Sequence, residues 1–344
     1  MKKLMMSAIL LTSFSASAVD INLSVTCGDI GGTTTTGNCK ALTDQINDEL
    51  DENLPDADIG DYGTGMANAN GFAYKGLGSD YSDNFDYIMI RGAAGAAVDG
   101  DIDDPENADG IAVGASITVG LNLDLLPVDK IGPIDLEKMD LFVSFMSYDI
   151  DEDDKDLNIK GELSSFGVMA RYQIVDGKDF IGGHMFEWGG VFLHTGFQRS
   201  SWNVDLKSDF DDQEVDAGGG VTGTFQDAFA KFGVESTTTT IPVEVSTYLR
   251  AGYIFTFYGG AGFDLVSGTT DVDLSAGGSI DGDSTTYSAT MDASEDATGD
   301  ADATNFRGFF GTQFNIPFVR VYAQVNKGFG NDLLGVNAGV KILW

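Results

Sequence analysis

Residues 336–344 end the chain with the sequence V-N-A-G-V-K-I-L-W. Val336, Ala338, Val340, Ile342 and Trp344 share one parity, and the residues between them are polar, small or aliphatic. Successive side chains of a strand point to opposite faces. The stretch therefore predicts a strand with one apolar face, and this strand ends the chain.

The same alternation recurs upstream over unusual lengths. Ile111–Leu125 has Ile, Val, Ala or Leu at every odd position and mostly small or polar residues at the even ones. A tilted strand needs only about 9–11 residues to cross a bilayer. Ten such strands are predicted, at Phe85–Val98, Ile111–Leu125, Asp140–Tyr148, Leu157–Val175, His184–Leu206, Ile241–Tyr253, Phe255–Thr270, Asn305–Ile316, Phe318–Asn326 and Val336–Trp344. A further hairpin from Val221–Phe225 and Ala228–Val234 would make twelve.

Two of these segments change parity along their length. In Leu157–Val175 the apolar side chains are odd-numbered in the first half and even-numbered in the second. A bulge near Ser164 would reconcile the two halves. His184–Leu206 shows a similar shift.

A terminal strand that closes on an aromatic residue resembles the last strand of bacterial outer-membrane β-barrel proteins, which usually end in Phe. The resemblance implies that Val340, Ile342 and Trp344 form the signal that the barrel-insertion machinery reads. It also implies an all-β fold, an antiparallel transmembrane barrel over residues 84–344. The expected surroundings are outer-membrane lipid and lipopolysaccharide.

Residues 1–18 predict a secretory signal peptide. Lys2 and Lys3 precede an apolar run, and Ala16-Ser17-Ala18 forms an A-x-A cleavage site. The run is too short to span a bilayer. The expected location is the bacterial outer membrane.

Cys27 and Cys39 are the two cysteines of the chain. Export places them in an oxidising compartment, so we expect one disulfide worth about 3 kcal/mol. A metal or redox pair would need a nearby His or a C-x-x-C spacing, which the sequence lacks.

Residues 19–80 differ from the strand-rich remainder. Apolar residues spaced about four apart predict a helix over Cys39–Leu54, and Gly65–Gly76 predicts a second short helix. The sequence of Ala67–Asp86 resembles the segment before the first strand in the long-chain fatty-acid transporter family, whose amino terminus forms a hatch in the lumen. This resemblance implies a periplasmic or luminal cap or plug.

The connections between strands fall into two groups. Short turns are expected at one rim, and long acidic loops such as Lys207–Thr240 and Asp271–Thr304 at the other. Short periplasmic turns and long extracellular loops are the usual barrel layout. An even number of strands then places both termini in the periplasm.

Acidic residues dominate the loops, and the formal net charge is −35. Such a surface repels nucleic acid and attracts cations. The spacing of these acidic residues does not match a calcium-binding EF-hand loop, because the Gly and the Glu that such a loop requires are missing. Two alternatives stay open, a solvated like-charged rim or weak Ca²⁺ or Mg²⁺ binding that bridges to lipopolysaccharide phosphates. The residues are Asp99, Asp101, Asp103, Asp104, Asp149, Asp151, Asp153 and Asp154.

Charged residues also lie opposite the apolar faces of the predicted strands. A charge facing lipid costs about 2–4 kcal/mol at mid-depth, so these residues are expected to face the lumen. They could line an aqueous pore or form a closed, paired ladder. They are Lys160, Glu162, Arg171, Glu244, Arg250, Arg307, Arg320 and Lys341.

Function is expected to be non-enzymatic. The two histidines, His184 and His194, have no evident nucleophile partner, and G-x-S-x-G is absent. We expect no cofactor. The first hypothesis is a passive, cation-preferring channel for small solutes. The alternatives are a structural or adhesin-like barrel that meets a surface partner through its long loops, and a hydrophobic-substrate transporter with an amino-terminal hatch.

Overall fold

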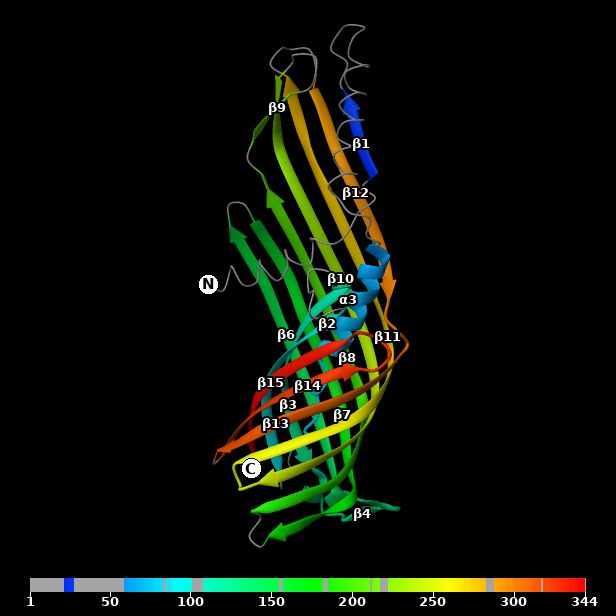
Figure 1. Ribbon diagram of the computed structural model, residues 1–344, viewed down its shortest axis with the longest axis vertical. Coiled ribbons are helices and arrows are strands. Elements are labelled where there is room, and N and C mark those ends of the chain that lie inside the picture. Colours follow the sequence, from blue (N-terminus) through cyan, green and yellow to red (C-terminus); the bar gives the residue numbers. More distant parts are fainter. Residues whose placement is uncertain are drawn as a thin grey trace.

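The computed structural model describes residues 22–27, 59–82, 85, 87–100, 108–154, 157–181, 185–210, 212–216, 222–282, 288–316 and 318–343. Ten antiparallel strands close into a ring, because the last strand, β15, pairs with the first, β2, and β10 pairs with β11 (Figure 1). In ring order they are β2 (Ile88–Asp99), β3 (Gly110–Asn122), β6 (Met139–Asp154), β7 (Leu157–Ile181), β8 (Phe186–Asp209), β10 (Thr222–Ala251), β11 (Phe255–Gly282), β13 (Thr304–Ile316), β14 (Val319–Gly328) and β15 (Leu334–Leu343).

The remaining elements lie inside this ring or beyond one of its two ends (Figure 1). They are β1 (Asn22–Cys27), α3 (Ile59–Ala73), β9 (Gln213–Asp216), β12 (Ser288–Asp300), the hairpin of β4 (Lys130–Ile131) and β5 (Ile134–Asp135), and two 3-10 turns at Leu123–Leu125 and Leu136–Lys138. In the described part of the chain, no helix is long and apolar enough to cross a bilayer.

The ten predicted strands correspond to the ten strands of the ring, so this prediction is confirmed. The alternative of twelve is wrong, because Val221–Phe225 and Ala228–Val234 do not form a separate hairpin. Residues 222–251 are a single strand that pairs with β11 throughout, with one irregularity between Gln226 and Phe229.

Apolar side chains cover the outside of the ring. On β13, Phe306, Phe310 and Phe314 are exposed, whereas Arg307 and Gln313 are buried inside. The same arrangement holds around the ring, with exposed Ile, Val, Leu and Phe side chains on each strand. An apolar exterior on a closed ring is what contact with lipid requires. The chain is therefore an outer-membrane β-barrel.

The two rims of the barrel differ. At one rim, short turns join β10 to β11 and β13 to β14, and the chain's carboxy-terminal strand ends there. At the other rim, several strands continue far past the ring (Figure 1). Because periplasmic turns are short, we assign the first rim to the periplasm and the second to the outside.

The strands β6 to β12 extend above the extracellular rim as a tall sheet, which we call the blade (Figure 1). β14 and β15 have 10 residues each, whereas β10 has 30 and β11 has 28. At about 3.3 Å per residue, β10 is roughly 100 Å long. The segments expected as long loops, Lys207–Thr240 and Asp271–Thr304, are instead mostly strands of this blade.

The parity shifts have a different cause from the predicted bulge. β7 pairs with β6 without a register break near Ser164, and on β8 all buried side chains from Phe192 to Val204 have even numbers. What changes is the surroundings. Low on β8 the outward residue Leu193 faces lipid, whereas high on β8 the outward Asn203 faces water and the inward Trp202 is buried. The apolar residues change from the outer to the inner face of the strand because the outer face meets lipid low on the strand and water high on it.

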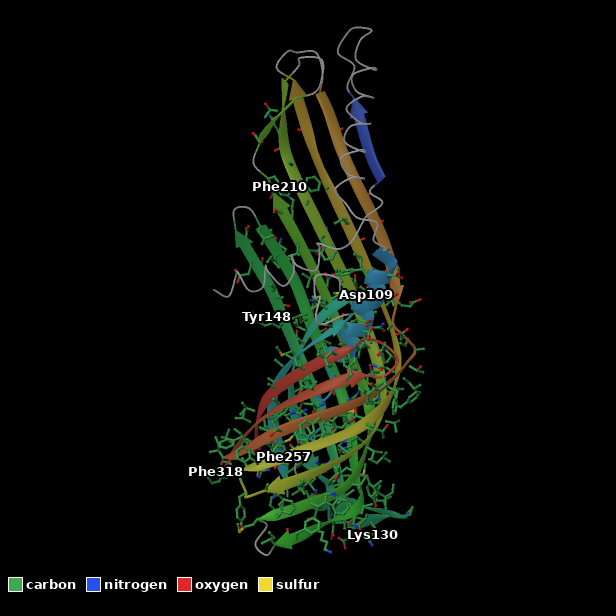
Figure 2. All side chains as sticks on the ribbon, viewed as in Figure 1. Asp109, Lys130, Tyr148, Phe210, Phe257 and Phe318 are labelled. Atoms are coloured by element: carbon green, nitrogen blue, oxygen red, sulfur yellow. The ribbon has the colours of Figure 1, made fainter. Side chains whose placement is uncertain are left out.

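We predict that Phe310→Arg destabilises the barrel in lipid by about 2–4 kcal/mol, because Phe310 lies mid-strand on the outside of β13. Phe210→Arg is the matched control. Phe210 is also more than half exposed but lies just above the end of β8 in the blade, where water surrounds it (Figure 2). Urea unfolding in lipid vesicles measures both, and equal losses would contradict the membrane assignment of β13.

Candidate functional site

Residues 59–82, which we call the plug, occupy the lumen. The contacts of the plug along β10 give its direction. Asn70 Nδ2 donates to Ser236 Oγ at 3.0 Å, and further on Tyr81 Oη donates to Glu244 Oε2 at 2.7 Å. β10 runs from the extracellular to the periplasmic end, so the plug descends in the same sense. The helix predicted over Gly65–Gly76 is observed as α3, Ile59–Ala73.

α3 lies at the extracellular opening and packs against the inner face of the blade. Small residues allow this close approach, since a Cβ on Gly63 would lie 2.9 Å from the backbone nitrogen of Gly299 in β12. Apolar side chains of α3 and of the blade form one buried cluster. Its members include Met66, Ala69, Phe72, Trp202, Val204, Phe232, Val234 and Val272.

Residues 74–82, which we call the strap, continue from α3 down the lumen without a strand partner. Side chains of the barrel wall supply hydrogen bonds to the carbonyl groups of the strap, which a buried backbone requires. The donors are Asn337 Nδ2 to Lys75 (2.8 Å), Thr118 Oγ1 to Leu77 (2.8 Å), Arg171 Nη1 to Asp80 (2.9 Å), and Arg91 to both Leu77 and Ser79.

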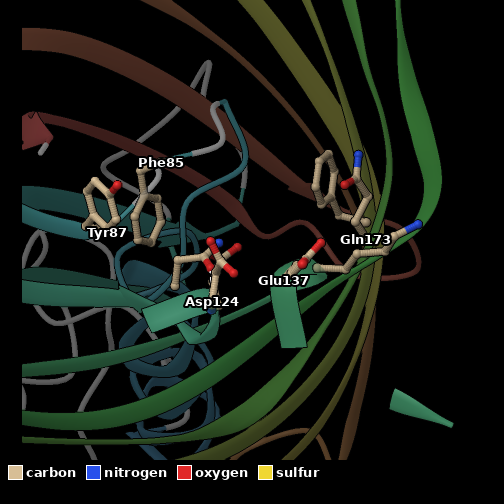
Figure 3. A pocket seen from close by; sticks show the side chains of 9 residues that line it. Phe85, Tyr87, Asp124, Glu137 and Gln173 are labelled. Carbon is tan, nitrogen blue, oxygen red and sulfur yellow. Dashed lines mark hydrogen bonds between the residues drawn. The ribbon is translucent and has the colours of Figure 1, made fainter. Parts of the chain in front are cut away.

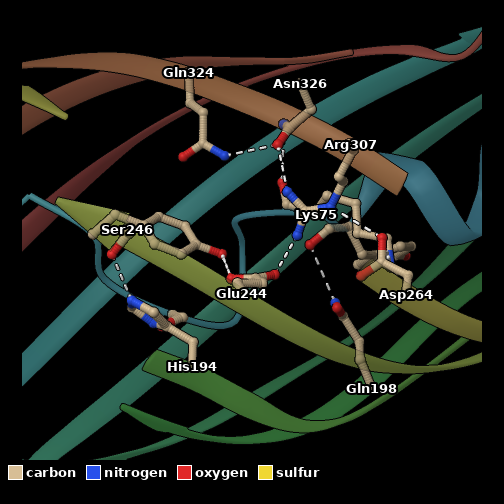
Figure 4. Close-up of polar contacts among 12 residues, drawn as sticks. Lys75, His194, Gln198, Glu244, Ser246, Asp264, Arg307, Gln324 and Asn326 are labelled. Atoms are coloured by element: carbon tan, nitrogen blue, oxygen red, sulfur yellow. Dashed lines mark hydrogen bonds and ion pairs between the residues drawn. The ribbon is translucent and has the colours of Figure 1, made fainter. Parts of the chain in front are cut away.

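A first buried ion cluster joins the strap to β10, β11 and β13 (Figure 4). Arg307 bonds to Glu244, and its Nε donates to Asp264 Oδ2 at 3.0 Å. Lys75 Nζ of the strap lies 3.2 Å from the same oxygen of Asp264. Tyr81 of the strap donates to Glu244. The four charged side chains are at most 3% exposed.

A second cluster lies closer to the periplasm. Lys341 Nζ of β15 lies 2.6 Å from Asp80 Oδ2 and 2.9 Å from Ser82 Oγ. Arg171 bonds to the backbone of Asp80 and, through Nε, to Asp140 Oδ2 at 2.7 Å. Removing one partner of a buried pair leaves an uncompensated charge. The two clusters therefore hold the strap firmly in the lumen.

His194 is fully buried between the strap and the wall. Its Nδ1 lies 2.8 Å from Ser79 Oγ and its Nε2 lies 2.7 Å from Ser246 Oγ. These contacts connect the strap to β8 and β10.

The predicted luminal charges separate into two groups. Arg171, Glu244, Arg307 and Lys341 are buried in the two ion clusters, Arg250 pairs with Glu187 at 3.1 Å, and Arg320 lies on the inward parity of β14.

Lys160 and Glu162 differ from the expectation, because both are exposed on the outer face of β7. They lie in the blade, above the level where lipid replaces water. There the inward position belongs to the buried Ile159. The prediction had assumed that one parity faces lipid along the whole strand.

A cavity of about 430 Å³ lies at the periplasmic end of the lumen (Figure 3). Phe85, Asn122, Asp124, Glu137 and Asp140 are among the residues that line it. Phe192 also lines it, and the guanidinium carbon of Arg171, which bonds to the backbone of Asp80 in the strap, lies 4.9 Å from the centroid of the Phe192 ring. This vestibule therefore leads to the plug.

Acidic residues surround α3 at the extracellular mouth. Asn68 Nδ2 donates to Asp99 Oδ2 at 2.9 Å, and Asn68 Oδ1 accepts from the backbone of Asp302 at 2.8 Å. Burial, together with the nearby Asp109 and Asp332, raises the pKa of Asp99 to about 6. A carboxyl group with a raised pKa stabilises the docked state when protonated.

We predict that docking of α3 weakens as the pH rises from about 4 to 6, because the unfolded carboxyl titrates near 3.9 and Asp99 of the folded chain near 6. The stabilisation is complete below this window and lost above it. Hydrogen exchange of Ile59–Ala73, corrected for the intrinsic effect of pH, measures it. Asp99→Asn should reduce the dependence, because burial also raises the pKa of Asp109 beside α3, whereas Asp153→Asn, exposed on β6, should retain it in full. An undiminished dependence in Asp99→Asn would contradict the assignment.

The other predicted acidic residues are only partly described. Asp149, Asp151 and Asp153 are exposed at the top of β6, and Asp154 ends that strand. Residues Asp101, Asp103 and Asp104 lie outside the described residues. Within the described ranges, no group of three or more His, Cys, Asp or Glu side chains is placed to hold a metal ion. Weak cation binding stays a prediction.

The terminal segments are described in part. Val340 and Ile342 lie on the outer face of β15, and Trp344 lies outside the described residues, so the insertion signal stays a prediction. Cys27 ends β1, whereas Cys39 lies outside the described part of the chain. The helix predicted over Cys39–Leu54 and the signal peptide also lie outside the described part of the chain.

Comparison with known proteins identifies one family and several solved structures that resemble this chain. A family model described as Lsa36-like matches residues 20–344. No curated protein matches the chain. Among solved structures, the translocator domain of the autotransporter NalP from Neisseria meningitidis is 10% identical, with a TM-score of 0.33 over 76% of this chain and 90% of its own. A Pseudomonas aeruginosa FadL homologue is 9% identical, with a TM-score of 0.25 over 81% of this chain and 98% of its own.

Proposed function

The chain belongs to the Lsa36-like family, and we propose that it is a surface-presenting protein whose closed barrel anchors the blade in the outer membrane. The observation that carries this proposal is the filled lumen. Two buried ion clusters and a chain of wall donors hold the strap across the lumen. A barrel closed in this way contributes an anchor instead of a route for solutes.

The blade supplies the surface that such an anchor would present. Its outer face is polar and acidic where β6 and β7 rise above the membrane, with Asp149, Asp151 and Glu162 exposed. Charged surfaces of one dominant sign steer partners of the opposite sign. We therefore propose that a surface partner, if it binds the blade, is cationic or reaches it through divalent cations. Lipopolysaccharide and the insertion machinery stay proposed partners on the basis of the fold.

A passive channel is the second candidate, and the polar wall favours it. Arg91, Arg171 and Glu244 would line water if the plug left the lumen. The hydrophobic-substrate transporter has less support, because Asp124, Glu137 and Asp140 line the periplasmic vestibule. We propose no catalytic role and no cofactor.

Planar-bilayer recording of the purified full-length protein tests the proposal. We expect no stepwise current, because the strap fills the lumen and its charges are paired. A porin of known conductance, reconstituted by the same procedure, shows that barrels enter these bilayers and that their current is detected. A steady current from the full-length chain would favour the channel instead.

A further inference from the structure

Two described elements that precede the barrel in sequence lie at its extracellular end. α3 packs on the blade, and β1 pairs with β12 from Asn22↔Ser294 to Cys27↔Ala289 (Figure 1). β12 in turn pairs with the upper part of β11, from Thr269 to Asp281. This position conflicts with the expectation that an even number of strands places both termini in the periplasm.

The ring gives the chain one path between these positions. β2 begins at Ile88 on the periplasmic rim, and the residues before it run up through the lumen to α3. Each neighbouring pair of ring strands is hydrogen-bonded, including β15 with β2. The strap is therefore enclosed by wall on all sides. A segment that starts in the periplasm can reach the blade only through the ring.

The wall is built to hold an extended chain in this path. Donors from β2, β3, β7 and β15 meet successive carbonyl groups of the strap, at Lys75, Leu77, Ser79 and Asp80. The strap also carries the charges that complete both ion clusters, Lys75 in one and Asp80 in the other. The fit is specific to residues 74–82, so it forms when this part of the chain, and no earlier part, lies in the lumen.

We propose that the barrel delivers its own amino-terminal segment to the cell surface through the lumen, and that the strap then locks the lumen. In this scheme β1 adds to the edge of β12 once it is outside. The paired charges of the strap stop the movement at a defined register. The cell surface therefore displays the amino-terminal segment as well as the blade.

An epitope tag between Asp20 and Ile21 tests the location. The matched control is the same tag between Gly132 and Pro133, in the exposed β4–β5 loop at the periplasmic rim. We expect the first tag to bind antibody equally in intact and permeabilised cells, and the second only after permeabilisation. An amino-terminal tag that needs permeabilisation, in a variant that keeps the heat-shifted electrophoretic form of a folded barrel, would overturn the proposal.

The route is tested separately from the location. A small domain that folds around a disulfide in the periplasm is fused before residue 21, with a cysteine-free, unfolded variant of the domain as the control. We expect the unfolded variant to appear on the surface and the folded one to be retained. Surface delivery of both would exclude the lumen as the route. Neither result depends on conductance, so these tests can fail while the closed-anchor function holds, and the reverse.

Discussion

Replacing Arg307 with methionine is expected to lower the free energy of unfolding by about 3–5 kcal/mol, because Glu244 and Asp264 would lose the cation between them in a dry site. Methionine fills a similar length without a charge. The midpoint of urea unfolding in detergent, followed by tryptophan fluorescence, measures the loss. The heat-shifted electrophoretic form reports independently whether the barrel is folded.

Two controls separate the buried charge from the loss of any cation. Lys327 pairs with Asp332 at 3.8 Å, with side chains 44% and 83% exposed, so Lys327→Met should cost only about 0–1 kcal/mol. Adding Glu244→Gln to Arg307→Met removes one of the unpaired charges and should recover part of the loss. A shift for Arg307→Met no larger than that for Lys327→Met would show that the cluster contributes little.

The sequence predicted the barrel well because one physical rule governs most of it. Where a strand crosses lipid, the outward parity must be apolar, as at Ile117 and Val340, and the pattern can be counted directly. The rule fails above the membrane. There Leu163 and Trp202 point inward and pack near α3, so the parity of apolar residues reverses without any change in the strand. The alternation of apolar residues in the sequence does not show where along a strand the surroundings change from lipid to water.

The sequence predicted only some of the residues that form the ion clusters. Arg307 and Glu244 stand out as charges opposite apolar neighbours, and Asp264 could have been found in the same way between Phe263 and Leu265. Lys75 of the strap could not, since the strap has no periodicity to show which of its side chains is buried. Lys75 is buried because it lies inside the ring. Its partner Asp264 lies more than a hundred positions later in the sequence.

Deleting residues 19–82 is expected to convert the silent barrel into a conducting one. The deletion removes α3 and the strap, and the ring strands from β2 onward keep all their mutual pairings. Water would then reach the wall charges that the plug now buries, so their solvation replaces the lost partners Lys75 and Asp80. Deleting only residues 19–58 is the matched control, because it leaves the plug in place and should leave the barrel closed.

The ion preference of the deletion variant is expected to be weak, although the chain is strongly acidic. Selectivity depends on the charges that line the narrow part of the pore more than on distant loops. Once the plug is gone, the cations of the wall balance its carboxylates; the buried wall residues are Arg91, Arg171, Arg307 and Lys341 against Asp99, Asp140, Glu244 and Asp264. Reversal potentials across a KCl gradient measure this preference. A strong cation preference would place the selective region in the acidic mouth, and a silent deletion variant that is folded would mean that the wall collapses on its own charges without the plug.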